Sequence, residues 1–70
     1  MRAMFDQKQF AERLRVTIAR LGIDQKAAAK QIGVAESTVS RVSRGIGSAP
    51  NLENYLRLER WITKHEGKAA

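Results

Sequence analysis

Seventy residues provide one compact domain, because a chain of this length buries only about 60% of the surface that its unfolded form exposes. Apolar residues make up 43% of the chain and proline occurs once, a globular rather than a disordered composition. The absence of cysteine excludes disulfides and thiolate metal sites, and the single histidine, His65, cannot form a zinc site by itself. We therefore expect a single domain over residues 1–70, with an ordered core over about 6–65, held by packing and without a metal or a cofactor.

The charge of the chain is strongly positive: 13 Lys and Arg residues against 7 Asp and Glu residues give a formal net charge of +6. Such a field attracts nucleic acid, although some small proteins are basic only for solubility. No apolar run approaches the ~20 residues that a membrane span needs, and residues 1–10 lack the apolar segment of a signal peptide. We therefore expect a cytoplasmic protein with an anionic partner and no contact with a membrane.

The first expected helix covers about residues 6–21. Residues that recur at helical spacing line its inward face: Phe10, Leu14, Thr17, Ile18 and Leu21. Asp6 can cap the first free amides with Gln9 three positions on, and Gly22 suits the left-handed residue that follows a helix. Val16 lies off this face, where we expect an isolated exposed apolar residue.

A second, short helix is expected over residues 25–32, with Asp24 as its cap and Gly33 at its end. Three successive alanines keep its surface thin, so that another helix can approach closely. The residues expected to face inward are Ala28, Ala29 and Ile32. Lys26 and Lys30 share the outer face, which indicates either a solvated surface or contact with phosphate.

The third helix is expected over about residues 35–44, with Ala35, Val39 and Val42 facing inward. The opposite arc is polar, with Ser37, Ser40, Arg41 and Arg44 pointing away from the core and Glu36 and Thr38 at its flanks. Surface helices normally carry long Glu and Lys side chains, whereas small hydroxyls beside arginines leave room for another surface to approach. This pattern favours a reading face, with an ordinary solvated helix as the alternative.

After a glycine- and proline-containing loop over residues 45–50, Asn51 is expected to cap a fourth helix that continues to about His65. Its inward face is expected to hold Leu52, Tyr55, Leu56 and Ile62. Leu58 and Trp61 widen the apolar face beyond what three short helices need, so they are candidates for a homodimer contact, with completion of the core as the alternative. Residues 66–70 carry no core signal and are expected to fray.

Residues 22–45 have the layout of a helix-turn-helix. Ala29 is small where the two helices cross, Gly33 takes the turn conformation without steric cost, and Val34 closes the small core together with the two valines of the third helix. With Gln25 after the cap, the Gly33–Val34 turn and the run Ser-Thr-Val-Ser-Arg-Val before Arg44-Gly45, the stretch resembles the helix-turn-helix of the lambda-type phage repressor and Cro family. The resemblance extends over about residues 10–62. It implies an all-α, compact four-helix fold in which the second and third helices bind DNA.

In this family the start of the third helix, the recognition helix, touches base edges. The resemblance selects Glu36, Ser37, Thr38 and Arg41 as base-reading residues, and the hydroxyl of Ser40 adds a further candidate. Their chemistry agrees, because arginine pairs bidentately with guanine, glutamate accepts from the cytosine amino group, and hydroxyls bond to bases or phosphates. The resemblance also implies contacts to the DNA backbone from Gln25, Ser43 and Arg44, to which the charge of Lys26 adds a further candidate.

Three departures from the family pattern bear on the structure. Ala35 replaces the usual hydroxyl cap of the recognition helix, which weakens that helix by ~1 kcal/mol unless Ser37 or bound DNA compensates. Ile18 and Ser43 occupy the positions of an ion pair between the first helix and the end of the recognition helix. Glu59 stands where relatives have a small apolar residue, so it either pairs with a nearby arginine or tilts the fourth helix.

The sequence therefore predicts a transcriptional regulator, Cro- or repressor-like, that binds an inverted-repeat operator in double-stranded DNA as a homodimer, at least on DNA. The simplest mechanism is occlusion, because a dimer that covers two half-sites about one turn, ~10 bp, apart blocks polymerase. Catalysis is not expected, since the chain has no cysteine, no glycine-rich phosphate loop and no close acidic cluster. RNA binding is disfavoured because the aromatic residues are scattered along the chain.

The scaffold leaves several roles open. A phage repressor, an antitoxin, a restriction–modification controller and a plasmid regulator share it, and the alternative outside DNA binding is an adaptor or antitoxin-type subunit whose main partner is another protein. No small-molecule ligand is expected. We expect the protein at the nucleoid of a bacterial or phage-infected cell, and its operator and dimer surface stay open.

Overall fold

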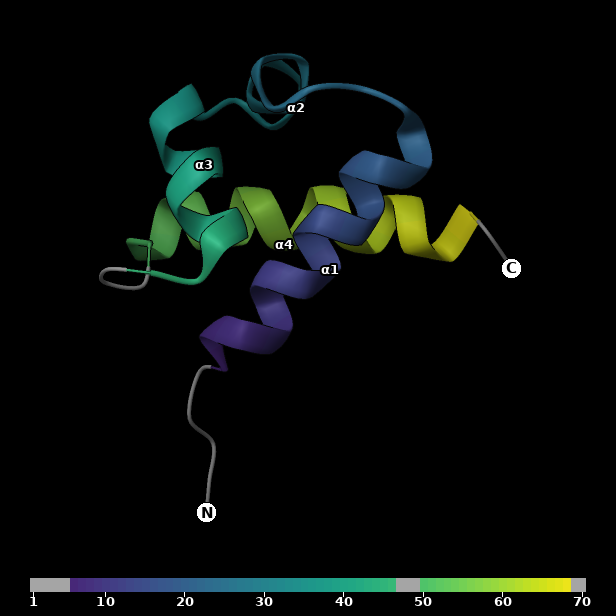
Figure 1. Cartoon of the computed structure of the whole chain (residues 1–70). Helices are drawn as coiled ribbons and strands as arrows, with labels where there is room; N and C mark the ends of the chain where they lie inside the picture. The colour runs from purple at the N-terminus through teal and green to yellow at the C-terminus, as the bar shows by residue number, and fades with distance from the viewer. Residues whose placement is uncertain (1–5, 47–49, 69–70) are drawn as a thin grey trace.

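The computed structural model describes residues 6–46 and 50–68, which form four α-helices (Figure 1). The helices are α1 (Gln7–Leu21), α2 (Gln25–Ile32), α3 (Glu36–Arg44) and α4 (Leu52–Lys68). In Figure 1, α1 crosses α4, with α2 at the top of the view and α3 at its left. The described residues contain no strand, and none of their helices is long and apolar enough to cross a membrane. The predicted all-α fold of four helices is confirmed.

The ends of the first three helices lie within one residue of their predicted places. The Asp6 carboxylate accepts from the backbone N–H of Gln9 at 3.1 Å, and the Asp24 carboxylate accepts from that of Ala27 at 2.8 Å. Each aspartate thereby satisfies an amide that the helix itself leaves free. Ala35 forms no such bond, which confirms the prediction that α3 lacks a side-chain cap.

The core is a single cluster to which all four helices contribute. Its buried members are Phe10, Leu14, Ile18, Ala28, Ala29, Ile32, Val39, Val42, Leu58, Trp61 and Ile62. Thr17 is buried beside them and donates its hydroxyl to the carbonyl of Arg13 at 2.8 Å, which satisfies a polar group that burial would otherwise penalise. The rings of Phe10 and Tyr55, with centroids 5.2 Å apart, extend the cluster between α1 and α4.

The inward face of α4 differs from the predicted one. Leu58 and Trp61 are 0% and 7% exposed, so the prediction that they contact a second copy of the chain is wrong and the alternative, completion of the core, holds. Leu52 and Leu56, predicted to face inward, are instead 71% and 46% exposed. The reason is geometric: with ~100° between successive residues, a helix that turns Leu58 and Ile62 inward carries these two leucines outside the buried arc.

Smaller corrections concern the ends of elements. Leu21 is exposed, because the last turn of α1 extends beyond the packed cluster. Ala35 is exposed as well, since its extended backbone as the cap residue takes it off the inward face of α3. The helix α4 continues to Lys68, past the predicted end near His65. Residues 47–49 of the predicted loop and residues 69–70 lie outside the described part of the chain.

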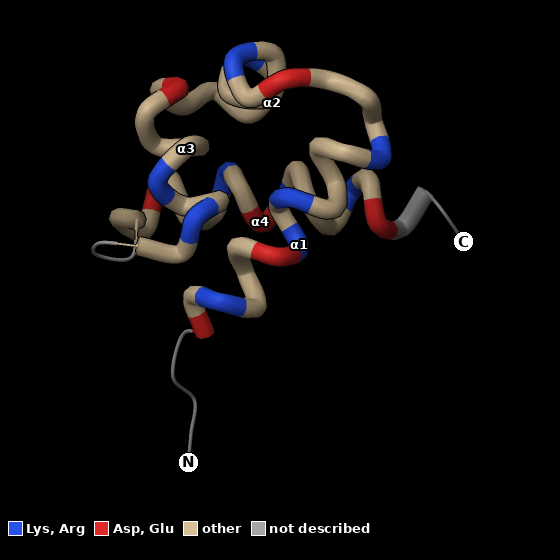
Figure 2. Tube along the Cα trace, in the orientation of Figure 1, with Lys and Arg blue, Asp and Glu red and all other residues tan. Residues whose placement is uncertain are grey.

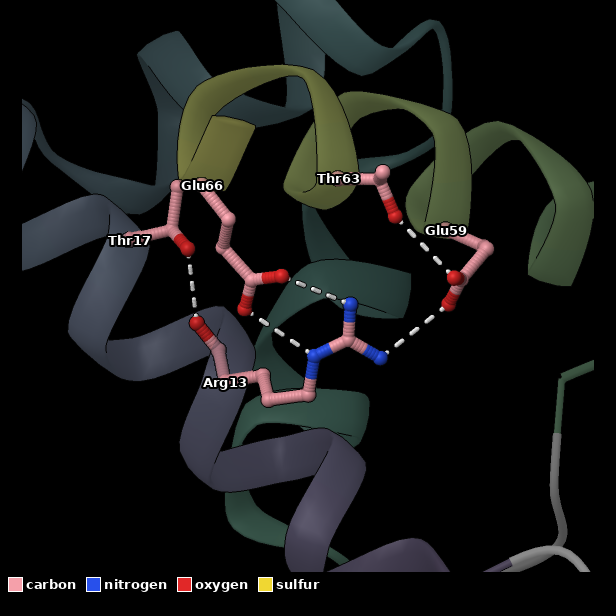
Figure 3. Close-up of polar contacts among 5 residues, drawn as sticks. All are labelled: Arg13, Thr17, Glu59, Thr63 and Glu66. Carbon is pink, nitrogen blue, oxygen red and sulfur yellow. Dashed lines mark hydrogen bonds and ion pairs between the residues drawn. The ribbon is translucent and has the colours of Figure 1, made fainter. Parts of the chain in front are cut away.

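Arg13 of α1 joins two carboxylates of α4 (Figure 3). Its Nη1 lies 3.2 Å from Glu59, and its Nε and Nη2 each lie 3.0 Å from one oxygen of Glu66, a bidentate arrangement. The Thr63 hydroxyl donates to the second oxygen of Glu59 at 3.0 Å. Of the two outcomes that the sequence left open for Glu59, the structure therefore shows pairing with an arginine. Glu66, predicted to lie in a frayed end, holds α4 against α1.

We expect this cluster to stabilise the fold less in acid. The hydrogen bond from Arg13 lowers the pKa of Glu66 below its ordinary value of 4.5. A carboxyl with a depressed folded-state pKa contributes stability above its unfolded pKa and loses that contribution as the pH falls through the folded-state pKa. Because the pair is exposed, the loss should be at most about 1 kcal/mol.

The measurement is urea unfolding of wild type and Glu66→Gln between pH 7 and pH 3. The free energy of unfolding should fall less steeply with acid in the variant than in the wild type. Glu12→Gln, which removes one exposed negative charge from α1 and leaves the pair of Arg13 and Glu66 in place, serves as the control for a change in net charge. The same slope in all three proteins would mean that Glu66 does not carry the effect.

Candidate nucleic-acid interface

The outer face of α3 is polar and open to solvent. Glu36, Ser37 and Arg41 are exposed, Thr38 and Ser40 are partly buried, and Val39 and Val42 occupy the buried side of the same helix. The residues predicted to read bases therefore lie together along one helix, as their spacing predicts. Glu36 lies in the first turn, where a negative charge is favourable to the helix dipole, so it stabilises α3 whether or not it meets a base.

The two arginines on this face differ in their partners. Arg44 donates from Nη2 to the Ser40 hydroxyl oxygen at 2.6 Å, one turn earlier on α3. The side chain of Arg41 makes no hydrogen bond or ion pair with the described residues. A guanidinium presents five N–H donors in a planar fork, so Arg41 offers a complete bidentate donor set to an approaching acceptor.

Ser43 lies inside the protein rather than on this face. It is 2% exposed, its hydroxyl donates to the Ser40 carbonyl at 2.9 Å, and the same oxygen accepts from the amide nitrogen of Gln25 at 3.2 Å. The prediction that its side chain contacts the DNA backbone is therefore wrong, because an enclosed hydroxyl with both roles filled cannot reach a phosphate. It instead ties the start of α2 to the end of α3.

Gln25 gains a defined orientation from this bond. The Ser43 proton is committed to the carbonyl of Ser40, so the amide atom that faces Ser43 must be the donating nitrogen of Gln25. One N–H and the amide oxygen of Gln25 are left for other partners. Lys26, the next residue of α2, is exposed. Both residues lie in the first turn of α2. This is the segment that the sequence predicts to contact the DNA backbone.

Arg15 is a structural residue that the sequence analysis did not single out. It reaches from α1 and donates from Nη1 to the backbone carbonyl of Ser43 in the last turn of α3. It thereby connects the two helices whose family-type ion pair is replaced here by Ile18 and Ser43. Carbonyls in a last helical turn lack amide partners, and cations are favourable there. An arginine on α1 one turn before Ile18 is the signal that could have identified it.

Lysine and arginine residues occur in all four helices (Figure 2). Those near the outer surface of the two middle helices are Lys26, Lys30, Arg41 and Arg44. Only two acidic residues, Asp24 and Glu36, lie in or directly before these helices, and both are at helix starts. Together α2 and α3 therefore carry a net positive charge, which favours the binding of a polyanion. No three acidic or histidine side chains of the described residues are grouped to hold a metal ion.

A family model described as Helix-turn-helix matches residues 18–60 of the chain. The match contains the end of α1, the whole of α2, the turn, α3 and the first half of α4. The chain belongs to this helix-turn-helix family. It is a DNA-binding protein of the XRE type, whose members bind double-stranded DNA and include lambda repressor- and Cro-like proteins. No curated protein and no solved structure matches the chain.

Proposed function

We propose that this helix-turn-helix protein is a sequence-specific transcriptional regulator that represses by occupying an operator. The observation that carries the proposal is the outer face of α3, where the guanidinium of Arg41, without a partner among the described residues, lies on the same helix face as the small hydroxyls of Ser37 and Thr38. Small side chains allow the helix to approach the floor of the major groove, and a free arginine fork matches the two acceptors of guanine. Such a face suits base reading better than solvation alone.

The remaining contacts follow from the geometry of α2 and α3. Ser40 accepts from Arg44 and keeps its own proton, so its hydroxyl donates to a base or phosphate while Arg44 turns toward the backbone. Gln25, oriented by its bond to Ser43, uses its second N–H on a phosphate, with Lys26 beside it. Glu36 accepts from a cytosine amino group in the adjacent base pair. In this arrangement α3 reads sequence and the first turn of α2 sets its register.

An inverted-repeat operator needs a dimer, and we assign the dimer contact to Leu52 and Leu56. These leucines lie one turn apart on α4 and are 71% and 46% exposed. Large exposed apolar side chains grouped on one face favour an interface, and a two-fold axis lets the same pair meet itself. In the sequence the patch begins where α4 begins, at Leu52, and α4 directly follows α3 in the order of helices, which suits an axis between two half-sites.

The same surface argues for a dimer that is weak without DNA. Stable interfaces bury about 800 Å² on each partner, and two leucines supply a small part of such an area. Binding of two protomers to adjacent half-sites adds the missing stability. The operator-bound dimer then excludes polymerase, which is the proposed mechanism of repression.

Selection from a randomised pool of duplexes, followed by mobility-shift assays at low and high salt, tests the proposal. We expect an inverted-repeat motif with half-sites about one helical turn, ~10 bp, apart and a shifted species that contains two protomers. Affinity that depends on salt and not on sequence would contradict the proposal, and it would favour the adaptor or antitoxin-type alternative. The salt series separates phosphate contacts from base contacts, because phosphate contacts alone give a steep salt dependence without sequence selectivity.

The dimer surface has its own test in the variant Leu52→Ser/Leu56→Ser. We expect at least a roughly tenfold loss of affinity for the two-half-site duplex, because the protomers no longer assist each other, and an unchanged affinity for a single half-site. Val16→Ser removes an exposed apolar side chain from α1 and should bind both duplexes as the wild type does. Equal binding of the double variant to the two-half-site duplex would place the dimer contact elsewhere.

A further inference from the structure

The helix α4 holds the turn between α2 and α3 through an arginine. Arg57 donates from Nη1 to the backbone carbonyl of Gly33 at 2.7 Å, across 24 residues of sequence. The Nη2 of the same guanidinium donates to Glu53 at 2.9 Å, one turn earlier on α4. One turn later, Trp61 donates from its indole nitrogen to the side-chain oxygen of Gln31 at 3.1 Å. We call the bond between Arg57 and Gly33, with Glu53 behind it, the turn clamp.

Gly33 is suited to such a contact by its conformation. Its φ of 92° lies in the left-handed region, and its N–H and that of Val34 both donate to the Ala29 carbonyl, at 2.8 and 3.1 Å, which closes α2. The Gly33 carbonyl lies beyond the end of the helix, and Arg57 supplies its donor. A Cβ at Gly33 would lie 3.3 Å from Arg57 Nη1, so the absence of a side chain also allows the close approach of the guanidinium.

The two ends of the helix-turn-helix are held by different helices. At the end of α3, Arg15 of α1 bonds to the Ser43 carbonyl, and Gly45 lies close to Ala11 of α1. At the turn before α3, the connection to the rest of the fold passes to α4. Helix α2 packs extensively on α3 but contacts α4 over a much smaller region. Individual polar contacts therefore contribute a larger share of the interaction between α2 and α4. The turn clamp is one of them.

We propose that Arg57 is a positioning residue for DNA reading: it sets the direction in which α3 leaves the turn. Glu36, Ser37 and Thr38 follow the turn directly, so a small rotation at Gly33 displaces the side chains assigned to base edges. Sites of this kind need their reading groups within about 0.5 Å of the productive geometry. Arg57 does this without touching DNA. The inference rests on the proposed function of α3 as a reading helix.

The experiment compares Arg57→Gln with Arg60→Gln. Both residues are exposed on α4, and both variants lose one positive charge, but the Arg60 side chain makes no hydrogen bond or ion pair with the described residues. For the duplex selected by the wild type, we expect Arg57→Gln to raise Kd about tenfold, the size expected for loss of one charge-assisted hydrogen bond. Arg60→Gln should stay within about twofold, as expected for an exposed charge. Arg57→Lys, which keeps the charge and N–H donors but lacks the planar fork that bonds to Gly33 and Glu53 together, should recover part of the affinity.

A second measurement does not depend on DNA. Residual dipolar couplings of the free protein report the angle between α3 and α4, and urea unfolding shows that each variant is folded. The angle should change or broaden in Arg57→Gln and stay as in the wild type in Arg60→Gln. A readout of orientation separates positioning from a general loss of stability, since a variant that is merely less stable keeps the native angle while folded.

The outcomes are distinct. If Arg57→Gln matches Arg60→Gln in both angle and affinity, or if the angle changes while the affinity for the selected duplex does not, the proposal is overturned. If the wild type selects no motif, the proposed function fails, and couplings that differ between the two variants still support Arg57 as the residue that orients α3. A changed angle together with weaker, less selective binding supports the whole inference.

Discussion

The variant Arg41→Ala is expected to weaken binding to the selected duplex by roughly 5- to 150-fold, corresponding to the 1–3 kcal/mol of a bidentate arginine–guanine pair. Arg41 has the only guanidinium of α3 without an intramolecular partner among the described residues, so its removal leaves the fold unchanged. The loss should concentrate at one base position in each half-site, where the preference for guanine relaxes. Competition assays with duplexes substituted at each position measure this profile.

Arg60→Ala is the matched control for this variant, because it removes an exposed arginine of equal charge from α4. It should reduce affinity for every duplex by the same small factor, through net charge alone. If Arg41→Ala also weakens binding uniformly, without relaxing any position, then Arg41 contacts phosphate and the base-reading assignment moves to Ser37, Thr38 or Ser40.

The variant Leu58→Ala is expected to lower the free energy of unfolding by about 2–5 kcal/mol. Leu58 is 0% exposed and belongs to the core cluster to which all four helices contribute, so its truncation leaves a cavity that the surrounding side chains cannot fill. Small domains have little stability in reserve, so a large part of this variant should be unfolded near 37 °C. Urea denaturation followed by circular dichroism measures the loss.

Leu56→Ala is the control, since it makes the same substitution in the same helix two residues away. The change in helix propensity is then the same in both variants and cancels when their free energies of unfolding are compared. Its side chain is 46% exposed, and we expect a loss below about 1 kcal/mol. Equal destabilisation by the two variants would mean that α4 does not have the rotation described here. The comparison thus tests directly the surface that we assign to the dimer.

The starts and ends of the first three helices could be predicted because their signals are local. Asp6 and Asp24 each bond to an amide three positions away, and Gly33 supplies a conformation that residues with a Cβ rarely adopt. The polar face of α3 could be predicted for the same reason, since a helix of known start has a determined periodicity. The end of α4 could not, because Glu66 extends the helix through a partner, Arg13, that lies 53 residues earlier.

The candidate site was predictable in its exposed part and not in its supports. Arg41 and Ser37 lie where the helical pattern places them, whereas Ser43, of the same residue type as Ser37 and Ser40, is enclosed by Gln25 and α1. The helical period does place Ser43 on the inward arc with Val39, and Ser37 and Ser40 outside it. The bonds that Ser43 forms with Gln25 of α2 and Arg15 of α1 depend on how the helices pack, which no local pattern records.

The sequence by itself determined four helices, the helix-turn-helix at residues 22–45 and the identity of its outward face, because caps, turn glycines and periodicity act over a few residues. Only the tertiary structure decided that Leu58 and Trp61 are buried while Leu52 and Leu56 are exposed, and that Arg15, Arg13 and Arg57 bond to distant helices. The physical reason is that α4 carries more apolar residues than one face can hold. Its rotation is then chosen by the packing of α1, α2 and α3 against it, which no local pattern records.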